Sequence, residues 1–588
     1  MIKKWIVDEF IKKNIIQYIL GIIAVITSSL LALTIPKVLG YIIDFLRNKS
    51  ASQSKIAWVT LGMLGISAAL FISKFLMRYF IMGKARDLEC FLRAKLFEHL
   101  QKMPPKFFNQ RKTGDLMAYA TNDLTAIRQA FAFGLVFLID GIIINLTSFF
   151  VMVKTIDPIL TLISMGPVLT ALVLIIKLRK KMRQRFTEVQ RSFARMSDKI
   201  EENISGIRVI KAYVQENQEI DKINDECKHR MDVQLSYVRL SGLLGPVVQI
   251  CFGISFALVL IMGSRFVRMN RISLGDFVAF NTYLTLLMGP VSNVGKIVEV
   301  WQKAAASMKR LDDIFVIKSD INDDEANFKS DTLKGEIKIK DFSFSYPGSR
   351  KRALKDINIH VKPGQTLAIV GRTGSGKSTL VNLLLRLFKV DRGHIFIDGA
   401  DINDIPLSTL RENIGYVPQD NFLFSAAIDD NISFFRENAY KRSEIEDAAK
   451  MSDVYDNIMS FPEAFNTIVG ERGATLSGGQ KQRVSIARAI IKMPSILILD
   501  DSLSAVDTKT EEVILTNIKE ILKGRTGIII SHRISAIKNA DIIIFMENGM
   551  IAERGTHQEL LDLKGRYYKL YRAQMAEKNI KQMEEAAI

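Results

Sequence analysis

Long apolar runs fill the first half of the chain, and we find none in the second half. A run of about 20 apolar residues can cross a bilayer as a helix. Six such runs occur, the sixth being the least apolar, at residues 15–46, 57–82, 130–153, 159–176, 243–262 and 277–298. Residues 1–13 form an amphipathic, lysine-bearing segment suited to a membrane surface. We therefore predict a helical membrane domain over residues 1–317.

Basic residues indicate how this domain is oriented. Lys and Arg are concentrated between the second and third runs and between the fourth and fifth, whereas the turn at Thr155–Pro158 is almost uncharged. Basic connections remain on the cytoplasmic side of a membrane. Both connections have helical apolar periodicity. We expect them to extend the spans into the cytoplasm as two long loops, with both chain ends on that side.

The net charge of the 588 residues is +18. In a soluble protein this excess would suggest nucleic acid as a partner. Six membrane runs exclude a soluble nucleic-acid-binding protein, so we predict a lipid bilayer and no nucleic acid as a partner. The cysteines, Cys90, Cys227 and Cys251, are far apart, and neither a disulfide framework nor a zinc site is predicted.

The second half has the pattern of a soluble α/β domain. Residues 318–334 are polar and acidic, as is typical of a linker. Residues 336–344 alternate as in a strand, residues 367–370 form a short apolar run, and helical and strand patterns alternate after them. We predict a cytoplasmic α/β domain over residues 335–588.

A phosphate-binding loop follows the apolar run that ends at Val370. The segment fits the pattern G-x-x-x-x-G-K-[ST] between a strand and a helix, and consists of Gly371, Arg372, Thr373, Gly374, Ser375, Gly376, Lys377, Ser378 and Thr379. Lys377 is expected to reach the outer phosphates and the Ser378 hydroxyl to hold Mg²⁺. Asp500, after the apolar run 496–499, suits the same metal shell. These residues predict binding of ATP with Mg²⁺.

Between these two segments lies a second motif, which consists of Leu476, Ser477, Gly478, Gly479 and Gln480. It resembles the signature of the ATP-binding cassette (ABC) transporters. In that family, the signature of one nucleotide-binding domain covers the ATP held by another. The resemblance therefore implies a dimer in which this motif acts on the partner's ATP.

Four further residues each resemble a residue that has a known role in the family. Tyr346 resembles the aromatic residue that stacks on adenine, although a core or turn tyrosine is the alternative. Gln419 resembles the glutamine that contacts magnesium, and His532 resembles the histidine that contacts the γ-phosphate. Asp507 lies in a segment similar to the D-loop at the dimer interface. The match covers the whole soluble half.

The exporter branch of the family is the closest resemblance, because six spans precede one nucleotide-binding domain in a single chain. This implies the type IV exporter fold. Glu471-Arg472-Gly473 resembles a contact segment of exporters, and residues 113–123 and 202–211 resemble segments flanking the family's coupling helices. The implied location is the cytoplasmic membrane of a bacterium.

One residue departs from the family pattern. Asp501 stands where the family usually has glutamate, the catalytic base or water-orienting group. Aspartate is one methylene shorter, and a misplacement of about 1 Å can cost about a hundredfold in rate. The resemblance therefore implies one subunit of a heterodimer, with a slow ATP site here and a partner half-transporter that keeps the glutamate. A homodimer that uses Asp501 as a weaker base is the alternative.

Polar residues inside spans are candidates for substrate contact. Ionisable groups there are costly and often functional. Asp140, Asn145 and Asn281 are such residues, with interhelical packing as an equal alternative. An apolar cavity with few charges would suit amphipathic drugs or lipid-like compounds, while peptide export and an ATP-gated channel or regulator remain rival hypotheses.

Overall fold

The computed structural model describes residues 2–47, 53–433, 440–470, 473, 475–502 and 508–586. The chain divides into two compact units. The first consists of Met1–Gln101 with Lys112–Ile317, and the second of Lys102–Arg111 with Lys318–Ile588. The short segment Lys102–Arg111 thus belongs to the second unit, which the sequence analysis did not foresee.

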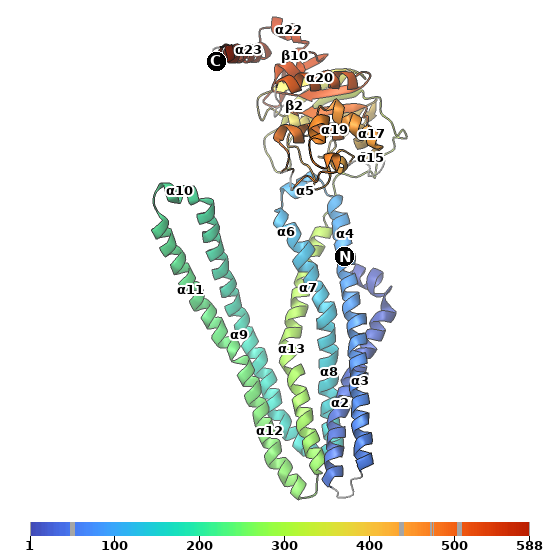
Figure 1. The fold of residues 1–588 in the computed structure, drawn as a ribbon, viewed down its shortest axis with the longest axis vertical. Coiled ribbons are helices and arrows are strands. Elements are labelled where there is room, and N and C mark those ends of the chain that lie inside the picture. Colours follow the sequence, from blue (N-terminus) through green and yellow to red (C-terminus); the bar gives the residue numbers. More distant parts are fainter. Residues whose placement is uncertain are drawn as a thin grey trace. The chain divides into compact units, whose positions relative to one another are not determined.

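The described residues of the first unit form helices and short connections (Figure 1). In chain order these are α1 (Ile2–Lys4), η1 (Trp5–Ile11), α2 (Ile15–Arg47), α3 (Gln53–Met77), η2 (Arg78–Met82), α4 (Gly83–Gln101), α6 (Thr113–Ala118), η3 (Tyr119–Asp123), α7 (Leu124–Gln129), η4 (Ala130–Gly134), α8 (Leu135–Val151), η5 (Met152–Ile156), α9 (Pro158–Ser205), α10 (Ile207–Ala212), α11 (Glu216–Gly242), α12 (Leu244–Arg268) and α13 (Leu274–Phe315). Several follow one another without a break and form long helical columns.

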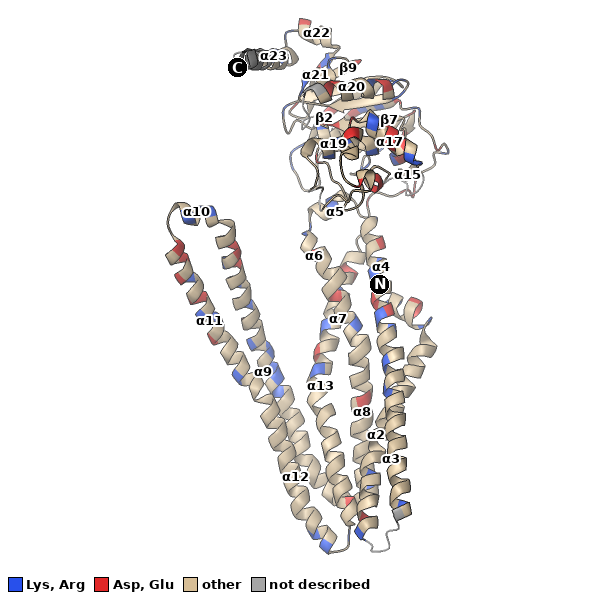
Figure 2. Cartoon of the chain, viewed as in Figure 1, with Lys and Arg blue, Asp and Glu red and all other residues tan. Residues whose placement is uncertain are grey.

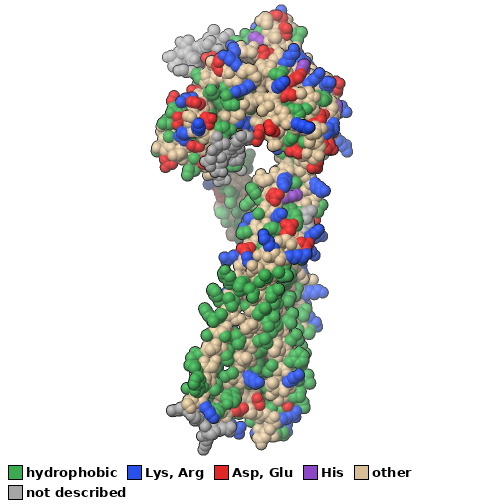
Figure 3. All heavy atoms as spheres, turned by 90° about the vertical axis from the view of Figure 1, so that its right-hand side faces the viewer, with side chains coloured by type: hydrophobic (Ala, Val, Ile, Leu, Met, Phe, Trp, Pro, Cys, Tyr) green, Lys and Arg blue, Asp and Glu red, His purple; other side chains and the backbone are tan. Residues whose placement is uncertain are grey.

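Five of these columns are long and apolar enough to cross a membrane. They are Ile15–Arg47, Ser54–Gln101, Thr113–Ile156, Pro158–Ser205 and Glu216–Arg268. Figure 3 shows hydrophobic side chains gathered in a broad band over one face of this unit. The sixth predicted run lies within α13, which forms a long helix but is not among the five.

Helix α13 can be less apolar than the other spans because it is packed among other helices. It contacts α2, α8 and α12. Phe280 and Leu284 are fully buried there, and the Tyr283 hydroxyl donates a hydrogen bond to the Leu33 carbonyl oxygen of α2 at 3.0 Å. A buried polar group is tolerated where it has such a partner. Contact with protein on several sides therefore lets α13 carry polar residues that a lipid-facing helix would not.

The turn before α9 is fixed by one buried carboxylate. Asp157 is 3% exposed and caps α9 by accepting hydrogen bonds from the backbone N–H groups of Ile159 (2.8 Å) and Leu160 (2.9 Å). Its other oxygen pairs with Nε of Arg271 at 2.6 Å. The turn between the third and fourth spans is thereby tied to the connection between α12 and α13.

The two basic connections extend the spans as predicted from their periodicity. Helix α9 continues unbroken from its apolar part to Ser205, and α11 runs beside it, joined through α10 (Figure 1). Lys and Arg residues lie along the part of α9 that follows the apolar run (Figure 2).

The N-terminal segment uses its apolar side for packing within the first unit. Ile2, Ile6 and Phe10 are buried. The Trp5 ring meets Phe315 of α13 edge to face at 4.7 Å, and Phe10 lies 5.7 Å from Phe91 of α4. The apolar face that we expected to rest on a membrane surface therefore contacts helices α4 and α13.

The second unit contains two sheets, which confirms the α/β prediction. Their strands are β1 (Ile337–Phe344), β2 (Leu354–Val361), β3 (Thr366–Gly371), β4 (Ile395–Ile397), β5 (Ala400–Asp401), β6 (Ile414–Val417), β7 (Ile496–Asp500), β8 (Thr526–Ile530), β9 (Ile542–Glu547) and β10 (Met550–Gly555). The smaller sheet has the order β2-β1-β4-β5 and the larger β10-β9-β3-β8-β7-β6. Strands β9, β3, β8, β7 and β6 pair in parallel, and two separate apolar clusters include residues from the strands of the larger sheet.

The helices of the second unit are mostly short. They are α5 (Pro105–Asn109), α14 (Lys377–Leu384), α15 (Leu407–Glu412), α16 (Ile428–Ser433), α17 (Arg442–Met451), α18 (Tyr455–Met459), η6 (Ala464–Asn466), α19 (Gly478–Ile490), α20 (Thr508–Ile521), α21 (Ile534–Ile537), α22 (His557–Asp562) and α23 (Arg566–Ala586).

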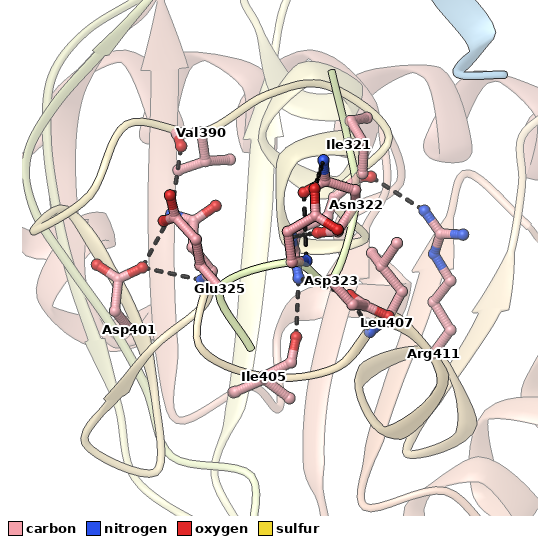
Figure 4. Close-up of polar contacts among 12 residues, drawn as sticks. Ile321, Asn322, Asp323, Glu325, Val390, Asp401, Ile405, Leu407 and Arg411 are labelled. Carbon is pink, nitrogen blue, oxygen red and sulfur yellow. Dashed lines mark hydrogen bonds and ion pairs between the residues drawn. The ribbon is translucent and has the colours of Figure 1, made fainter. Parts of the chain in front are cut away.

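The acidic segment after Ile317 is attached to the second unit by its own polar groups (Figure 4). Arg386, 5% exposed, donates hydrogen bonds to the carbonyl oxygens of Asn322 (2.9 Å) and Ile405 (2.8 Å). The Asp323 carboxylate accepts from the backbone N–H of Leu407 at 2.9 Å. This segment is therefore not a free tether along its described length.

We predict that Gly275→Ala will destabilise the first unit. Helices α2 and α13 meet so closely at Gly40 and Gly275 that a Cβ on Gly275 would overlap the Gly40 carbonyl oxygen. Overpacking of this kind costs about 1–3 kcal/mol, so the thermal unfolding midpoint of the detergent-purified protein should fall. Gly289→Ala on the same helix is the control, because its added Cβ meets nothing within 4 Å. Equal midpoints for the two variants would contradict the prediction.

Candidate nucleotide-binding site

The phosphate-loop segment connects β3 to α14. Gly374 and Gly376 have φ angles of +78° and +104°, which side-chain-bearing residues rarely adopt. A Cβ on Gly376 would lie 2.8 Å from the Ala353 carbonyl oxygen. A glycine turn that leads into a helix N-terminus binds anionic groups through its backbone N–H groups. The local structure therefore has the geometry that the sequence motif requires.

Lys377, the first residue of α14, is folded back over this loop. Its side-chain amine donates hydrogen bonds to the carbonyl oxygens of Gly371 (2.9 Å) and Arg372 (3.0 Å). The residue is 7% exposed. Burial lowers the pKa of Lys377, while the nearby carboxylates of Asp500 and Asp501 act in the opposite direction. The loop thus holds a buried amine beside two acidic groups.

Asp500 ends β7 and contacts the start of α14. It is 2% exposed, and this burial raises the pKa of Asp500, whereas a hydrogen bond from Ser378 opposes the rise. Gln419, after β6, lines one cavity together with Ser378 and Asp500. A carboxylate, a hydroxyl and an amide oxygen are ligands that suit Mg²⁺. No cluster of three or more His, Cys, Asp or Glu residues that could hold a metal occurs in the described part of the chain.

Tyr346 lies next to the phosphate loop. Its hydroxyl is hydrogen-bonded to the hydroxyl of Thr379 at 2.9 Å. Its ring packs edge to face against Phe344 at 5.3 Å and Phe388 at 5.1 Å. These contacts fix the ring at the edge of the cavity, where it could meet a flat base.

Asp501 and His532 follow two neighbouring strands, β7 and β8. The backbone N–H of Asp501 donates to the Ile530 carbonyl oxygen at 2.9 Å, and Asp501 has a φ of +48°, a left-handed conformation that aspartate tolerates better than most residues. Its carbonyl oxygen accepts from Nε2 of Gln482 at 3.2 Å. The main chain of Asp501 is therefore fixed at the end of β7, and Asp501 and His532 line the same cavity.

One cavity of about 170 Å³ collects most of the residues predicted to bind or hydrolyse ATP on this chain. It is lined by Tyr346, Thr373, Gly374, Gly376, Lys377, Ser378, Thr379, Gln419, Asp500, Asp501, Ile530 and His532. Gly371, Arg372 and Ser375 do not line it. The first two contribute the carbonyl oxygens that bind Lys377, and Ser375 accepts a hydrogen bond from the Gly549 N–H through its carbonyl oxygen at 3.2 Å.

The signature residues lie apart from this cavity, since Leu476, Ser477, Gly478, Gly479 and Gln480 are all absent from its lining. They form the start of α19, where the Ser477 hydroxyl accepts from the Gln480 N–H at 3.3 Å and the Gln480 side chain accepts from the Ser477 N–H at 2.9 Å. This capping box satisfies free N–H groups of the helix start. Glu471, Arg472 and Asp507 lie outside the described residues.

The three candidates within the spans each make a hydrogen bond to another group of the protein. Asp140 of α8 accepts a hydrogen bond from the Ser29 hydroxyl of α2 at 2.6 Å, so it joins two helices. Asn145 and Asn281 donate to carbonyl oxygens of their own helices, those of Gly141 (2.6 Å) and Phe277 (2.9 Å).

Two residues with a structural role in the sites were missed by the sequence analysis. Gln482, 1% exposed, lies two residues after the signature and contacts Asp501. Its position on the buried side of α19, at a helical spacing from the buried Ile486 and Ala489, was a usable signal. Gln574 contacts the backbone of His532 from the C-terminal helix, and no spacing in the sequence pointed to it.

Known protein families match both halves of the chain. Residues 18–291 match the family described as ABC transporter transmembrane region, and residues 354–504 match the family described as ABC transporter. The chain is 37% identical over 567 residues to the probable multidrug resistance ABC transporter ATP-binding/permease protein YheI of Bacillus subtilis, covering 96% of each chain.

Two further likenesses extend along the whole chain. It is 32% identical over 573 residues to an ATP-dependent lipid A-core flippase of Wigglesworthia glossinidia brevipalpis, covering 97% of each chain. The solved structure of a bacterial Atm1-family ABC exporter with ATP bound superimposes with a TM-score of 0.78 at 25% identity, over 96% of this chain and 99% of that one. This chain therefore belongs to the ABC transporter family, as an exporter half-transporter that fuses a type IV membrane domain to a cytoplasmic nucleotide-binding domain and couples ATP hydrolysis to transport.

Proposed function

We propose that this half-transporter is the slow-site subunit of a heterodimeric exporter of amphipathic drugs or lipid-like compounds. The observation that carries the proposal is Asp501, which lines the cavity beside His532 where the family usually has glutamate. The partner subunit would keep the glutamate and hold the faster ATP site. The intact signature beginning at Leu476 would cover the ATP bound to that partner.

The family resemblance supports a role for each cavity residue. Lys377 and the loop from Gly371 to Thr379 bind the phosphates, and Tyr346 stacks on the adenine. Ser378, Gln419 and Asp500 hold Mg²⁺, which when bound neutralises charge that develops on the phosphates. His532 contacts the γ-phosphate, and Asp501 orients the attacking water or accepts its proton.

Hydrolysis at this site is slow for a geometric reason. An aspartate and a glutamate at position 501 would extend from the same backbone atom. The aspartate side chain is shorter by about one carbon–carbon bond, so its carboxylate lies closer to the backbone. A displacement of about 1 Å at the water can cost about a hundredfold in rate. ATP binding does not depend on Asp501 in the same way, because Lys377 and Ser378 are positioned by their own contacts.

Transport follows from the two states of the assembly. Two bound ATP molecules close the pair of nucleotide-binding domains. The cytoplasmic parts of α9 and α11 carry this movement to the spans. Hydrolysis and phosphate release reset the assembly. The names of the multidrug and lipid A-core relatives support drugs or lipids as substrates, and their bacterial sources support the cytoplasmic membrane as the location.

Lys377→Ala should abolish most nucleotide binding by this chain. Hydrogen bonds to a charged group contribute about 1.5–3 kcal/mol, so the affinity for ATP should fall by about tenfold or more. Photolabelling of this chain with 8-azido-ATP measures the change. Lys389→Ala, at an exposed lysine of the same unit, is the control. Equal labelling of the two variants would contradict the assigned site.

Asp501 and the composition of the complex can be tested together. The complex purified from its native membrane should contain a second, different subunit by mass determination. Asp501→Asn should leave most of its ATP turnover intact, whereas Asp501→Glu should speed hydrolysis on this chain by up to about a hundredfold. A homodimer that loses its turnover with Asp501→Asn would make Asp501 the working catalytic carboxylate and overturn the proposal.

Asp140→Asn tests the substrate class. Asparagine can still accept the Ser29 hydrogen bond but carries no charge. We expect the KM for a cationic dye such as ethidium to rise by about tenfold in inside-out vesicles, with a neutral lipid-like dye unaffected. Ser29→Ala removes only the interhelical bond and serves as the comparison. If both variants slow the transport of both dyes equally, Asp140 serves in packing only.

A further inference from the structure

The loop that carries His532 is held from outside the ATP cavity. It begins where β8 ends, at Ile530, and leads into α21. The His532 side chain lines the cavity, but its main chain contacts other elements. Helix α20 supplies one set of contacts and helix α23 another.

The contact from α20 is a buried carboxylate. Glu511 is 2% exposed, pairs with the Arg533 guanidinium and accepts a hydrogen bond from the Ser535 hydroxyl at 2.9 Å. A buried carboxylate with two such partners is costly to displace. Glu511 therefore fixes the side of the loop that follows His532.

The contact from α23 is one side-chain amide that bridges the loop backbone. Nε2 of Gln574 donates to the carbonyl oxygen of His532 at 2.5 Å, and its Oε1 accepts from the N–H of Ile534 at 2.9 Å. Both polar atoms of the amide are thus used on residues directly before and after Arg533. A bidentate contact of this kind fixes orientation as well as distance, since two bonds share one rigid plane.

The start of α23 is itself firmly attached, so Gln574 is a fixed support. Tyr567 is fully buried, and its hydroxyl is hydrogen-bonded to Nδ1 of His557 at 2.7 Å. The Glu553 carboxylate accepts from the backbone N–H groups of Arg566 (2.5 Å) and Tyr567 (3.0 Å). Gln574 follows two helical turns later.

We propose that Gln574 is a positioning residue for His532, through which the C-terminal helix α23 sets the geometry of ATP hydrolysis. The proposal rests on the proposed role of His532 at the γ-phosphate. Removing the amide leaves the His532 carbonyl oxygen and the Ile534 N–H without their partner, and the loop can then move. A movement of about 1 Å at His532 is enough to slow the reaction strongly, while ATP binding by Lys377 is unaffected.

The test uses the complete complex with a tag on this chain. The variants are Gln574→Ala, Gln574→Glu, His532→Ala and the double variant Gln574→Ala with His532→Ala. Arg572→Ala, at an exposed residue on the same helix, is the control. Photolabelling with 8-azido-[α-³²P]ATP gives the affinity of this chain, and the fraction of labelled ADP on it with time gives its single-turnover hydrolysis rate.

Gln574→Ala is expected to slow hydrolysis by about tenfold or more with ATP affinity within about twofold of the parent. Gln574→Glu should slow it at least as much, because it keeps the acceptor for Ile534 but sets a carboxylate against the His532 carbonyl oxygen. The double variant should be no slower than His532→Ala alone, since Gln574 acts through His532. Hydrogen exchange at the Ile534 amide should rise in Gln574→Ala and stay unchanged in Arg572→Ala.

Two different failures can be told apart. If His532→Ala leaves hydrolysis on this chain unchanged, the proposed role of His532 is wrong, and the inference falls with it. If His532→Ala slows hydrolysis but Gln574→Ala does not, only the inference is overturned. An additive double variant with an equal loss of ATP affinity would also overturn it, because that pattern belongs to general destabilisation.

Discussion

Parallel pairing of four neighbouring strands is the constraint on which the nucleotide site depends. Strands β6, β7, β8 and β3 run in the same direction, so their carboxyl ends meet at one edge of the larger sheet. Each end supplies one part of the site: Gln419 after β6, Asp500 and Asp501 at β7, His532 after β8, and the phosphate loop after β3. Residues up to 161 positions apart in the chain, from Gly371 to His532, thereby come together. Ligands of open parallel sheets bind at this edge for the same reason.

Several of these residues could be picked out in the sequence because they end or follow an apolar run. Gly371 and Asp500 end buried strands of 6 and 5 residues, and His532 comes shortly after another buried strand of 5 residues. Such a strand is recognisable without knowledge of its neighbours. The strand order was not recognisable, nor was the contact of Tyr346 with Thr379, since both depend on tertiary packing. The role of Gln574 could not be predicted from the sequence. A glutamine on a polar C-terminal helix gives no local signal, and its importance arises from the two backbone groups that it happens to reach.

The membrane half illustrates the limit of apolarity as a guide. Five columns are long and strongly apolar, whereas the sixth and least apolar run lies in α13, which contacts α2, α8 and α12 and carries polar residues. The candidates for substrate contact were also harder to predict. An asparagine in a span can donate a hydrogen bond to a carbonyl oxygen of its own helix, as Asn145 and Asn281 do, and the sequence does not distinguish this from contact with a substrate. Asp140 differs because its partner, Ser29, belongs to another helix.

The division of the chain has a consequence for how its two units are joined. The polypeptide passes from one unit to the other at Gln101–Lys102, at Arg111–Lys112 and at Ile317–Lys318. Because Lys102–Arg111 belongs to the second unit, the helical columns that end at Gln101 and begin at Thr113 are both joined to that unit by short covalent links. The acidic segment after Ile317, held through Arg386, is the third link. A single cut after Ile317 would therefore leave Lys102–Arg111 covalently joined to the first unit.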